Sequence, residues 1–544
     1  MPLARSAITP ITNPCVSIRP VDVRGDFIIV GSGIAGLRAA VELAPFGDIV
    51  IITKADPNES NTEYAQGGIA AAIGKDDSPA LHAQDTMIAG DGLCDERAVR
   101  VLCDEGPRYT RELIEWGARF NFDADGEPAL ASEGAHSVRR VLHAADATGR
   151  EIGRVVWERM SAVARIRVLK NTLAVGAIVE DGRCLGVRFI DTHGEPGRAF
   201  ARATLLATGG AGQVFSETTN PEVATGDGVA IAFRAGARIA DLEFVQFHPT
   251  VLDVEDAPRF LLSEALRGEG ARLVDSTGEP FMPNYHKAGD LAPRDVVSRS
   301  IVLQSQRTGG PIYLSLRHLD PDDVHRRFPM IAATCLKAGL DLARDLLPVG
   351  PAAHYMMGGV ETDLDGRTSV PGLFAAGEVA CTRVHGSNRL ASNSLLEGLV
   401  FGARAGRAMV GPAREADLPA PVFRATGSEE KGSDRTPLAE ADVRALMWNS
   451  VGLFRAYSTL CDAFNVLRQQ QQALDDRLAA GATLDHSGWR RASLVTVAAL
   501  IARAALRREE SRGGHFRTDF PARDDLKWQI HVSDVGRPEG RHYE

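Results

Sequence analysis

The chain has 544 residues, enough for about three to four domains of ordinary size, which excludes a small binding module. Hydrophobic residues make up 44% and charged residues 24%, the balance of a globular protein rather than a disordered or fibrous one. The formal net charge of −10 argues against general binding to nucleic acid or to an acidic membrane surface.

The chain carries no sign of export, membrane insertion or metal binding. Residues 1–25 contain four prolines and no apolar core, so they predict a loose N-terminal arm rather than a secretory signal. The most apolar stretch, 492–502, is too short to span a membrane. The seven cysteines are scattered without a C-x-x-C pair, which excludes a disulfide framework and predicts no metal site. We expect a cytoplasmic protein.

The first element with a chemical signature is a strand, a glycine-rich turn and a helix. Residues 26–30 (DFIIV) predict a buried strand, and an apolar helix follows the turn formed by Gly31, Ser32, Gly33, Ile34, Ala35 and Gly36. The first glycine permits a tight turn, the second lets backbone approach a pyrophosphate, and the third lets helix and strand pack closely. Alone, this motif could be an ordinary loop before a helix. The second strand at 49–53 favours a dinucleotide site.

One departure weakens ordinary NAD binding, because Thr53 and Lys54 stand where the acidic ribose ligand is expected. Further glycine-bearing loops follow along the chain at 61–71, 205–212, 225–228 and 372–378. The first of these loops could alternatively be a surface turn. Together they indicate one long cofactor.

Polar residues that could bind a dicarboxylate lie between these loops. His248 alone would more often be a structural histidine, and Arg294 alone a solvated charge. However, Pro293 and the helical spacing of Val297 and Ile301 predict that Arg294 begins a helix, where a cation is disfavoured unless an anion joins it. With His354 and Arg389, the chain offers the fork and point donors that suit carboxylates.

The C-terminal part reads as helical. Residues 421–436 turn polar and predict a linker, and helical spacing follows at 443–454, with further helices expected at 461–479 and 487–509. We expect a helical bundle, and we interpret His515 as structural.

These motifs together resemble the flavoproteins of the succinate dehydrogenase, fumarate reductase and aspartate oxidase superfamily, from about Asp26 to the C-terminus. The resemblance implies an α/β Rossmann-type FAD-binding domain interrupted by an α+β capping domain and followed by a C-terminal helical bundle. The expected boundaries are an N-terminal arm at 1–25, the FAD-binding domain at 26–247 and 351–420, the capping and substrate domain at 248–350, the linker at 421–436, and the helical domain at 437–544.

The same resemblance implies FAD as the cofactor, and a Lys after the second strand is usual in that superfamily. The dehydrogenases attach FAD to the His of a Ser-His-Thr segment, where this chain has Ser60, Asn61 and Thr62, so we expect FAD to be bound non-covalently. Besides the turn at 31–36, the expected FAD contacts are Lys54, Asn61, Thr62, Ala65, Gln66, Gly67, Gly68, Ala174, Val175, Gly209, Gly210, Asp227, Glu378, Ser394 and Leu395.

For the substrate, the resemblance implies that His248 (in FHPT), His354 and Arg389 (in HGSNR) hold the carboxylates. Arg294 matches the arginine that transfers the substrate proton, although arginine seldom deprotonates. The remaining expected substrate contacts are Gln246, Ser263, Glu264 and Ser392.

Glu133 separates the branches of the superfamily. The segment around it, and the segment 385–401, resemble the aspartate oxidase versions. Succinate has no charged substituent at the reacting carbon, but aspartate carries an ammonium, which needs an anionic partner when buried. Glu133 would be that partner and one of the catalytic residues with Arg294 and His248. The alternative is a solvated loop glutamate, because the oxidases usually have Gly-Gly where this chain has Gly134 and Ala135.

The resemblance therefore implies FAD-dependent oxidation of L-aspartate to iminoaspartate, with oxygen or fumarate as acceptor, as the first step of de novo NAD biosynthesis, and quinolinate synthase as a functional partner. The alternatives are a soluble fumarate reductase, the flavoprotein subunit of a succinate dehydrogenase complex, and a flavin-dependent RNA-modifying protein. The net charge of −10 disfavours the last.

Overall fold

The computed structural model describes residues 21–57, 59–163, 165–255, 257–424 and 437–536. Residues 1–20 of the arm predicted at 1–25 and residues 425–436 of the linker predicted at 421–436 lie outside the described residues.

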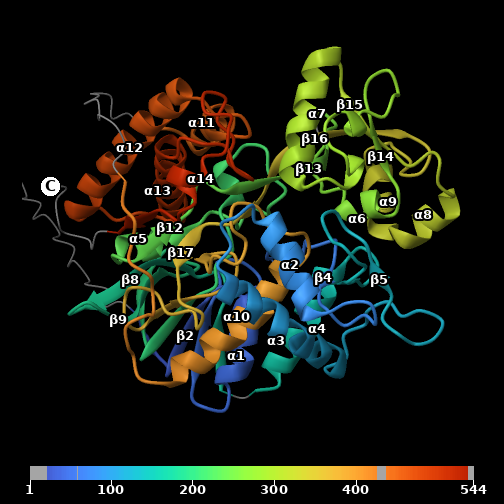
Figure 1. Cartoon of the computed structure of the whole chain (residues 1–544). Helices are drawn as coiled ribbons and strands as arrows, with labels where there is room; N and C mark the ends of the chain where they lie inside the picture. The colour runs from blue at the N-terminus through green and yellow to red at the C-terminus, as the bar shows by residue number, and fades with distance from the viewer. Residues whose placement is uncertain (1–20, 58, 164, 256, 425–436, 537–544) are drawn as a thin grey trace, which may run out of the picture.

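A five-stranded parallel sheet forms the centre of the lower part of the molecule in Figure 1. Its strand order is β18 (Leu373–Ala375), β11 (Ala203–Leu206), β2 (Phe27–Val30), β3 (Ile49–Ile52) and β7 (Ile166–Leu169). The inner strands are continuous apolar runs because both faces of a parallel sheet are buried. Phe27 and Ile29 belong to one core, and Ile28 and Val30 belong to another on the opposite face.

Helices cover both faces of this sheet. The first core is filled by α1 (Ile34–Leu43), α3 (Glu96–Glu115), α4 (Thr148–Ser161) and α10 (Asn393–Val410), and α2 (Pro79–Ala89) packs on α3. The second core includes α5 (Asp227–Arg234) and C-terminal helices. The chain segments that form α1 and α10 are far apart in sequence but lie against each other.

The predicted strand, turn and helix are present at the edge where the parallel strands end. Gly31 has a left-handed φ of +110°, and a Cβ there would collide with the Ala207 carbonyl. A Cβ on Gly36 would collide with the Gly31 carbonyl oxygen. Both positions therefore require glycine, and they bring the N-terminus of α1 close to β2.

A second sheet corrects the prediction for the end of the N-terminal arm. Residues expected to be loose form β1 (Val21–Arg24), which pairs in parallel with β10 (Pro196–Phe200), followed by β9 (Arg183–Ile190) and β8 (Leu173–Glu180). Val23 is buried, and Arg198 donates to Asp22 at 2.9 Å. The pairing partner is more than 170 residues away in sequence, so local pattern gave no sign of it.

Two small sheets complete the lower part. One consists of β4 (Ile69–Ala70), β6 (Val141–Leu142) and β5 (Leu130–Ala131). The other consists of β19 (Ala380–Cys381), β17 (Gly359–Glu361), β12 (Arg238–Ala240) and β20 (Ser533–Val535).

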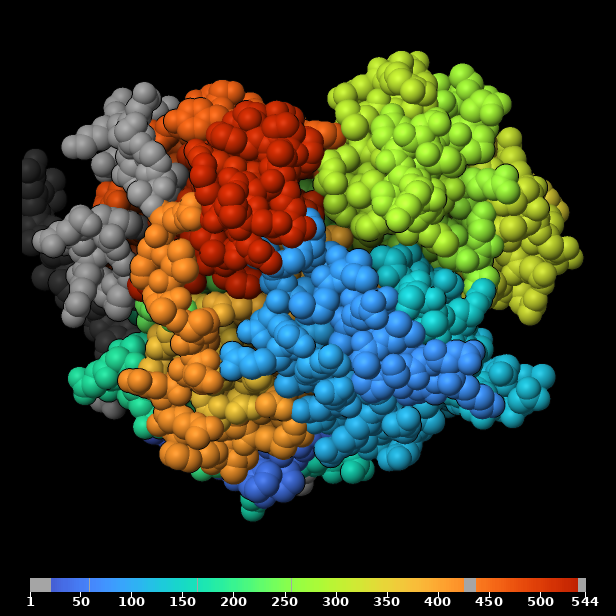
Figure 2. All heavy atoms as spheres, in the orientation of Figure 1, coloured from blue at the N-terminus to red at the C-terminus, as the bar shows by residue number. Residues whose placement is uncertain are grey.

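The yellow-green unit in the upper right of Figure 1 is built on a four-stranded antiparallel sheet with its own hydrophobic core. It stands out as a separate lobe in Figure 2. Its strands are β13 (Val245–Leu252), β16 (Leu346–Met356), β15 (Ile312–Ser315) and β14 (Arg272–Val274), and its helices are α6 (Glu264–Gly268), α7 (Arg294–Thr308), α8 (Pro321–Arg327) and α9 (Pro329–Lys337). The strands β13 and β16 that frame this unit are paired from Val245 to Met356, and its own core runs from Leu252 to Val349, so the predicted boundaries 248–350 lie between these limits. The paired segment is called the unit of residues 245–356.

The C-terminal part contains the predicted helices, coloured orange to red in Figure 1. They are α11 (Glu440–Val451), α12 (Tyr457–Ala479), α13 (His486–Arg507) and the short α14 (Asp525–Trp528). The prediction of a purely helical bundle is wrong in one respect, because this part also contains β20, which pairs with β12. His515 is fully buried against Arg455, with its Nε2 3.1 Å from the Arg508 carbonyl. No helix in the described part of the chain is long and apolar enough to cross a membrane.

The contact between α2 and α10 generates a testable prediction about acid stability. His82 Nε2 lies 2.8 Å from Asn393 Oδ1, and burial together with nearby Arg140 lowers the pKa of His82 to about 3. The unfolded chain binds a proton near pH 6.5 that the folded chain refuses, so the free energy of unfolding falls as the pH drops below 6.5.

The variant His82→Gln keeps a donor for Asn393 but cannot titrate. Between pH 7 and pH 5 it should lose about 2 kcal/mol less unfolding free energy than the wild type, as measured by urea unfolding at both pH values. The control His193→Gln alters an exposed histidine and should keep the wild-type pH dependence. Equal pH dependence in wild type and His82→Gln would contradict the prediction.

Candidate active site

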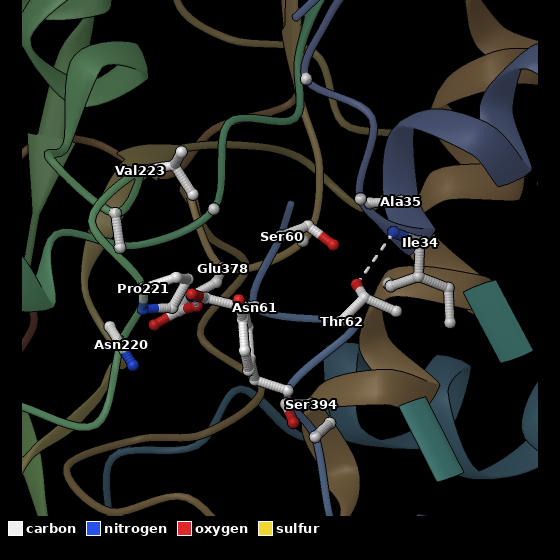
Figure 3. A pocket seen from close by; sticks show the side chains of 18 of the residues that line it. Ile34, Ala35, Ser60, Asn61, Thr62, Asn220, Pro221, Val223, Glu378 and Ser394 are labelled. Carbon is white, nitrogen blue, oxygen red and sulfur yellow. Dashed lines mark hydrogen bonds between the residues drawn. The ribbon is translucent and has the colours of Figure 1, made fainter. Parts of the chain in front are cut away.

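An elongated cavity lies where the parallel strands end, between the glycine-rich turn and the unit of residues 245–356. Figure 3 shows part of it, with Ile34 and Ala35 on one side and Asn220, Pro221 and Val223 on the other. Most residues predicted for cofactor and substrate line this cavity. They are Gly31, Ser32, Gly33, Ile34, Ala35, Lys54, Asn61, Thr62, Ala65, Gln66, Gly67, Gly68, Glu133, Ala174, Gly209, Asp227, His248, Ser263, Glu264, Arg294, His354, Glu378, Arg389, Ser392, Ser394 and Leu395.

Four predicted residues do not line it. Gly36 packs under the turn against Gly31, and Gly210 faces the side chain of Glu378 from behind. Val175 belongs to β8 and packs with Leu173 and Ile190. Gln246 lies behind the arginines of the site, as described below. Motif position alone could not separate residues that face the cavity from residues that support its wall.

The part of the cavity at the glycine-rich turn offers groups that suit a dinucleotide. The N-terminus of α1 opens into it at Gly33 without a side-chain cap, which leaves backbone N–H groups for a phosphate. Thr62 supports this end by accepting a hydrogen bond from the Ile34 backbone at 3.1 Å (Figure 3). Several buried polar atoms along the walls have no hydrogen-bond partner among the described residues: Asn61 Oδ1, Gln66 Oε1, Thr208 Oγ1 and Asn220 Oδ1. Such atoms call for hydrogen-bond partners, which a polar ligand or ordered water would supply.

Asn61 occupies the position where covalent attachment would require a histidine. Its Nδ2 donates to Glu378 Oε2 at 2.8 Å, and the two side chains meet in Figure 3. Burial raises the pKa of Glu378 to about 7. The side chain of Asn61 has no ring nitrogen to which FAD could be attached, so this position predicts non-covalent binding of FAD.

Two arginines share one oxygen atom at the other end of the cavity. Gln246 Oε1 accepts from Arg294 Nη1 and from Arg389 Nη2, both at 3.0 Å. Gln246 Nε2 donates to Asn388 Oδ1 and to the Arg389 carbonyl, which fixes the orientation of the amide. Because the amide is uncharged, it positions both guanidinium groups and leaves their positive charge for a ligand.

Each arginine has a second support. Arg294 begins α7, as predicted, and its Nε donates to Glu264 Oε2 at 2.5 Å. Arg389 lies over the ring of Tyr355, 4.1 Å from its centroid. Burial and the nearby Arg294 lower the pKa of Arg389 to about 10, so it stays charged at neutral pH.

His248 and His354 lie together, with ring centroids 5.1 Å apart. Burial, with Arg294 beside them, lowers the pKa of both rings well below the usual value. His248 Nδ1 accepts a hydrogen bond from the Thr250 backbone at 3.3 Å, while its buried Nε2 has no partner in the described structure. Both histidines are therefore neutral at physiological pH, and His248 has its remaining N–H available for a ligand.

Glu133 is buried rather than solvated, with 2% of its surface exposed, so the alternative of a solvated loop glutamate is wrong. Its Oε2 accepts from Ser392 Oγ at 2.6 Å. Burial and the neighbouring Glu264 raise the pKa of Glu133. Two residues near Glu133 have left-handed backbone. They are its hydrogen-bond partner Ser392, with φ of 61°, and Ala135, with φ of 64°. Such strained backbone is typical of functional sites.

Some cavity residues were missed by sequence reasoning. Tyr355 is adjacent to His354, and this neighbouring position could have drawn attention to it. The segment of Thr219, Asn220 and Pro221 forms a wall of the cavity, yet nothing in its sequence pattern marked it as part of a site.

Comparisons with known proteins agree with this geometry. Residues 26–395 match the FAD binding domain family, and residues 440–539 match the family described as fumarate reductase flavoprotein C-term. L-aspartate oxidase of Streptomyces coelicolor is 44% identical, over 94% of this chain and 91% of that protein. L-aspartate oxidase of a Nostoc species is 43% identical, over 93% and 92%. The chain belongs to the L-aspartate oxidase family. FAD is its cofactor, as predicted.

Solved structures place this L-aspartate oxidase family member in a wider group. A mutated FrdA chain of E. coli quinol fumarate reductase is 28% identical with a TM-score of 0.83, covering 96% of this chain and 98% of that chain. Sdh1 of Mycobacterium smegmatis is 31% identical with a TM-score of 0.76, covering 96% and 95%. The superfamily resemblance drawn from the motifs is confirmed.

The shared amide oxygen of Gln246 leads to a second testable prediction. Gln246→Glu would place a carboxylate between Arg294 and Arg389 and cancel part of the positive charge that attracts a dianion. We expect fumarate to bind at least about tenfold more weakly, since opposite charges at such distances interact by several kcal/mol in a partly buried site.

The dissociation constant can be measured from the change in FAD absorbance on titration with fumarate. Thermal unfolding of the variant, measured in parallel, separates lost affinity from lost structure. Unchanged affinity in a folded variant would show that the amide does not set the charge of the site.

Proposed function

We propose that this protein oxidises L-aspartate to iminoaspartate with FAD, and that oxygen or fumarate reoxidises the flavin. The observation that carries the proposal is the buried carboxylate of Glu133, which lies in the same cavity as two cationic side chains, Arg294 and Arg389. The two neutral histidines line that cavity as well. A dicarboxylate with an ammonium substituent matches this arrangement of charges.

In the proposed complex, Arg389, His248 and His354 bind the two carboxylates of the substrate. Glu133, held by Ser392, pairs with the ammonium, which fixes the rotation of the Cα–H bond. Because Glu133, Arg389 and His248 are buried, these interactions are stronger than they would be in water and hold the reacting carbon in place.

The oxidation removes a hydride from Cα and a proton from the nitrogen of aspartate. Bound FAD supplies the hydride acceptor. Arg294, held by Glu264 and Gln246, lies in the group that faces the substrate. We assign it the role of a relay that gives a proton to Glu264 as it takes up the proton from the substrate nitrogen, with His248 and Glu133 as the other catalytic residues. The unit of residues 245–356 serves as a cap in this proposal, because it contributes Arg294 and both histidines.

The same site would let fumarate act as an oxidant and take up a hydride and a proton. Fumarate can therefore serve as an alternative electron acceptor for an aspartate-oxidising enzyme. The rival assignment, a dedicated fumarate reductase, is less favoured because such an enzyme would have no need of Glu133. We further propose that iminoaspartate passes to quinolinate synthase in the first step of NAD biosynthesis.

The proposal is tested with the purified holoenzyme. We expect peroxide to form with L-aspartate in air, succinate to be a poor substrate, and the yellow cofactor to leave the protein on acid precipitation. Oxidation of succinate without peroxide formation from aspartate would overturn the assignment in favour of a dehydrogenase.

A sharper prediction concerns Glu133→Gln. Without the carboxylate, the substrate ammonium has no anionic partner, so aspartate oxidation should fall by about 100-fold or more, given the cost of an unpaired buried charge. Reduction of fumarate with a chemical electron donor should change only a few fold, because fumarate has no ammonium.

Glu63→Gln is the matched control, since Glu63 pairs with Arg150 near the surface and does not line the cavity. Both of its activities should stay at the wild-type level. Equal losses of aspartate oxidation and fumarate reduction in Glu133→Gln would exclude an ammonium-binding role.

A further inference from the structure

The ring of His354 has a hydrogen-bond partner that is not among the proposed substrate contacts. Thr219 Oγ1 lies 2.8 Å from His354 Nδ1. Thr219 comes from the segment before Asn220, which forms a wall of the cavity in Figure 3, whereas His354 comes from β16. The contact therefore joins two segments separated by 135 residues.

The direction of this hydrogen bond follows from the acceptors around Thr219. The nearest alternative acceptor for its hydroxyl is the Ala353 carbonyl, 3.5 Å away, a poor distance for an O–H donor. That carbonyl already accepts from the Thr219 backbone at 3.0 Å and from Thr218 Oγ1 at 2.9 Å, which fills both of its lone pairs. Among the described protein groups, His354 Nδ1 is therefore the best-placed acceptor for the Thr219 hydroxyl.

A histidine that accepts at Nδ1 carries its single proton on Nε2 when it is neutral. This choice matters because His354 is kept neutral and has only one N–H to give. With the proton on Nε2, the ring donates into the cavity. In the other tautomer, a lone pair would face the carboxylate and repel it.

We propose that Thr219 is a positioning residue that fixes the tautomer of His354, so that its Nε2–H donates to a substrate carboxylate. The Thr250 backbone does the same for His248, which leaves Thr219 as the side chain that sets the pair. The inference rests on the dicarboxylate site of the proposed function.

Thr219→Val keeps the shape of the side chain and removes its hydroxyl. We expect the holoenzyme variant to bind fumarate about 10- to 100-fold more weakly, as expected for a lost hydrogen bond to a charged ligand. Thr219→Ser should bind within about twofold of the wild type. Affinity is read from the change in FAD absorbance. With ¹⁵N-labelled histidine, the wild-type His354 signals should show an unprotonated Nδ1, and this signature should be lost in Thr219→Val.

Thr334→Val is the matched control, because Thr334 is half-buried like Thr219, its hydroxyl bonds the Met330 carbonyl, and it does not line the cavity. It should leave fumarate affinity within about twofold of the wild type. Wild-type affinity in Thr219→Val, failure of Thr219→Ser to restore binding, or an equal loss in Thr334→Val would overturn the inference. If the wild-type holoenzyme shows no response to fumarate or aspartate, the proposed function itself fails.

Discussion

Two positive charges held on one neutral oxygen are the constraint on which the site depends. Arg294 and Arg389 both donate to Gln246 Oε1 inside the protein, and removing such charges from water is costly unless partners compensate them. Glu264 compensates Arg294, and the face of Tyr355 supports Arg389. The position of Arg294 at the N-terminus of α7 adds to the positive potential. The compensation is incomplete on the cavity side, where a dianion completes it.

The residues of the site come from distant parts of the chain. Glu133 precedes α4, Arg294 begins α7 in the protruding unit, and Arg389 and Ser392 precede α10 on the central sheet. The neutral state of His248 and His354 lowers the electrostatic cost of bringing these residues together. Two more full charges in the same volume would raise the cost of folding, while neutral N–H donors add affinity without it.

Local sequence patterns predicted much of this structure. Residues that are neighbours in sequence determine the glycine-rich turn, the glycine-bearing loops and the C-terminal helices. Most of the predicted site residues also line the cavity. The failures depend on long-range pairing. β1 needs β10, β20 needs β12, and the depth of Gln246 depends on how β13 packs beneath the arginines. The role of Thr219 depends on which lone pairs of Ala353 are already taken, and no motif records that.

The return of β20 to β12 has a consequence for how the molecule is made. As the chain leaves the ribosome, the edge of β12 has no partner on that side until Ser533–Val535 have been synthesised. β12 is followed within a few residues by β13, which carries Gln246 and His248. An unpaired edge invites association with other nascent chains. The proposed dicarboxylate pocket thus adjoins a sheet that cannot be completed before the C-terminal strand β20 has been made.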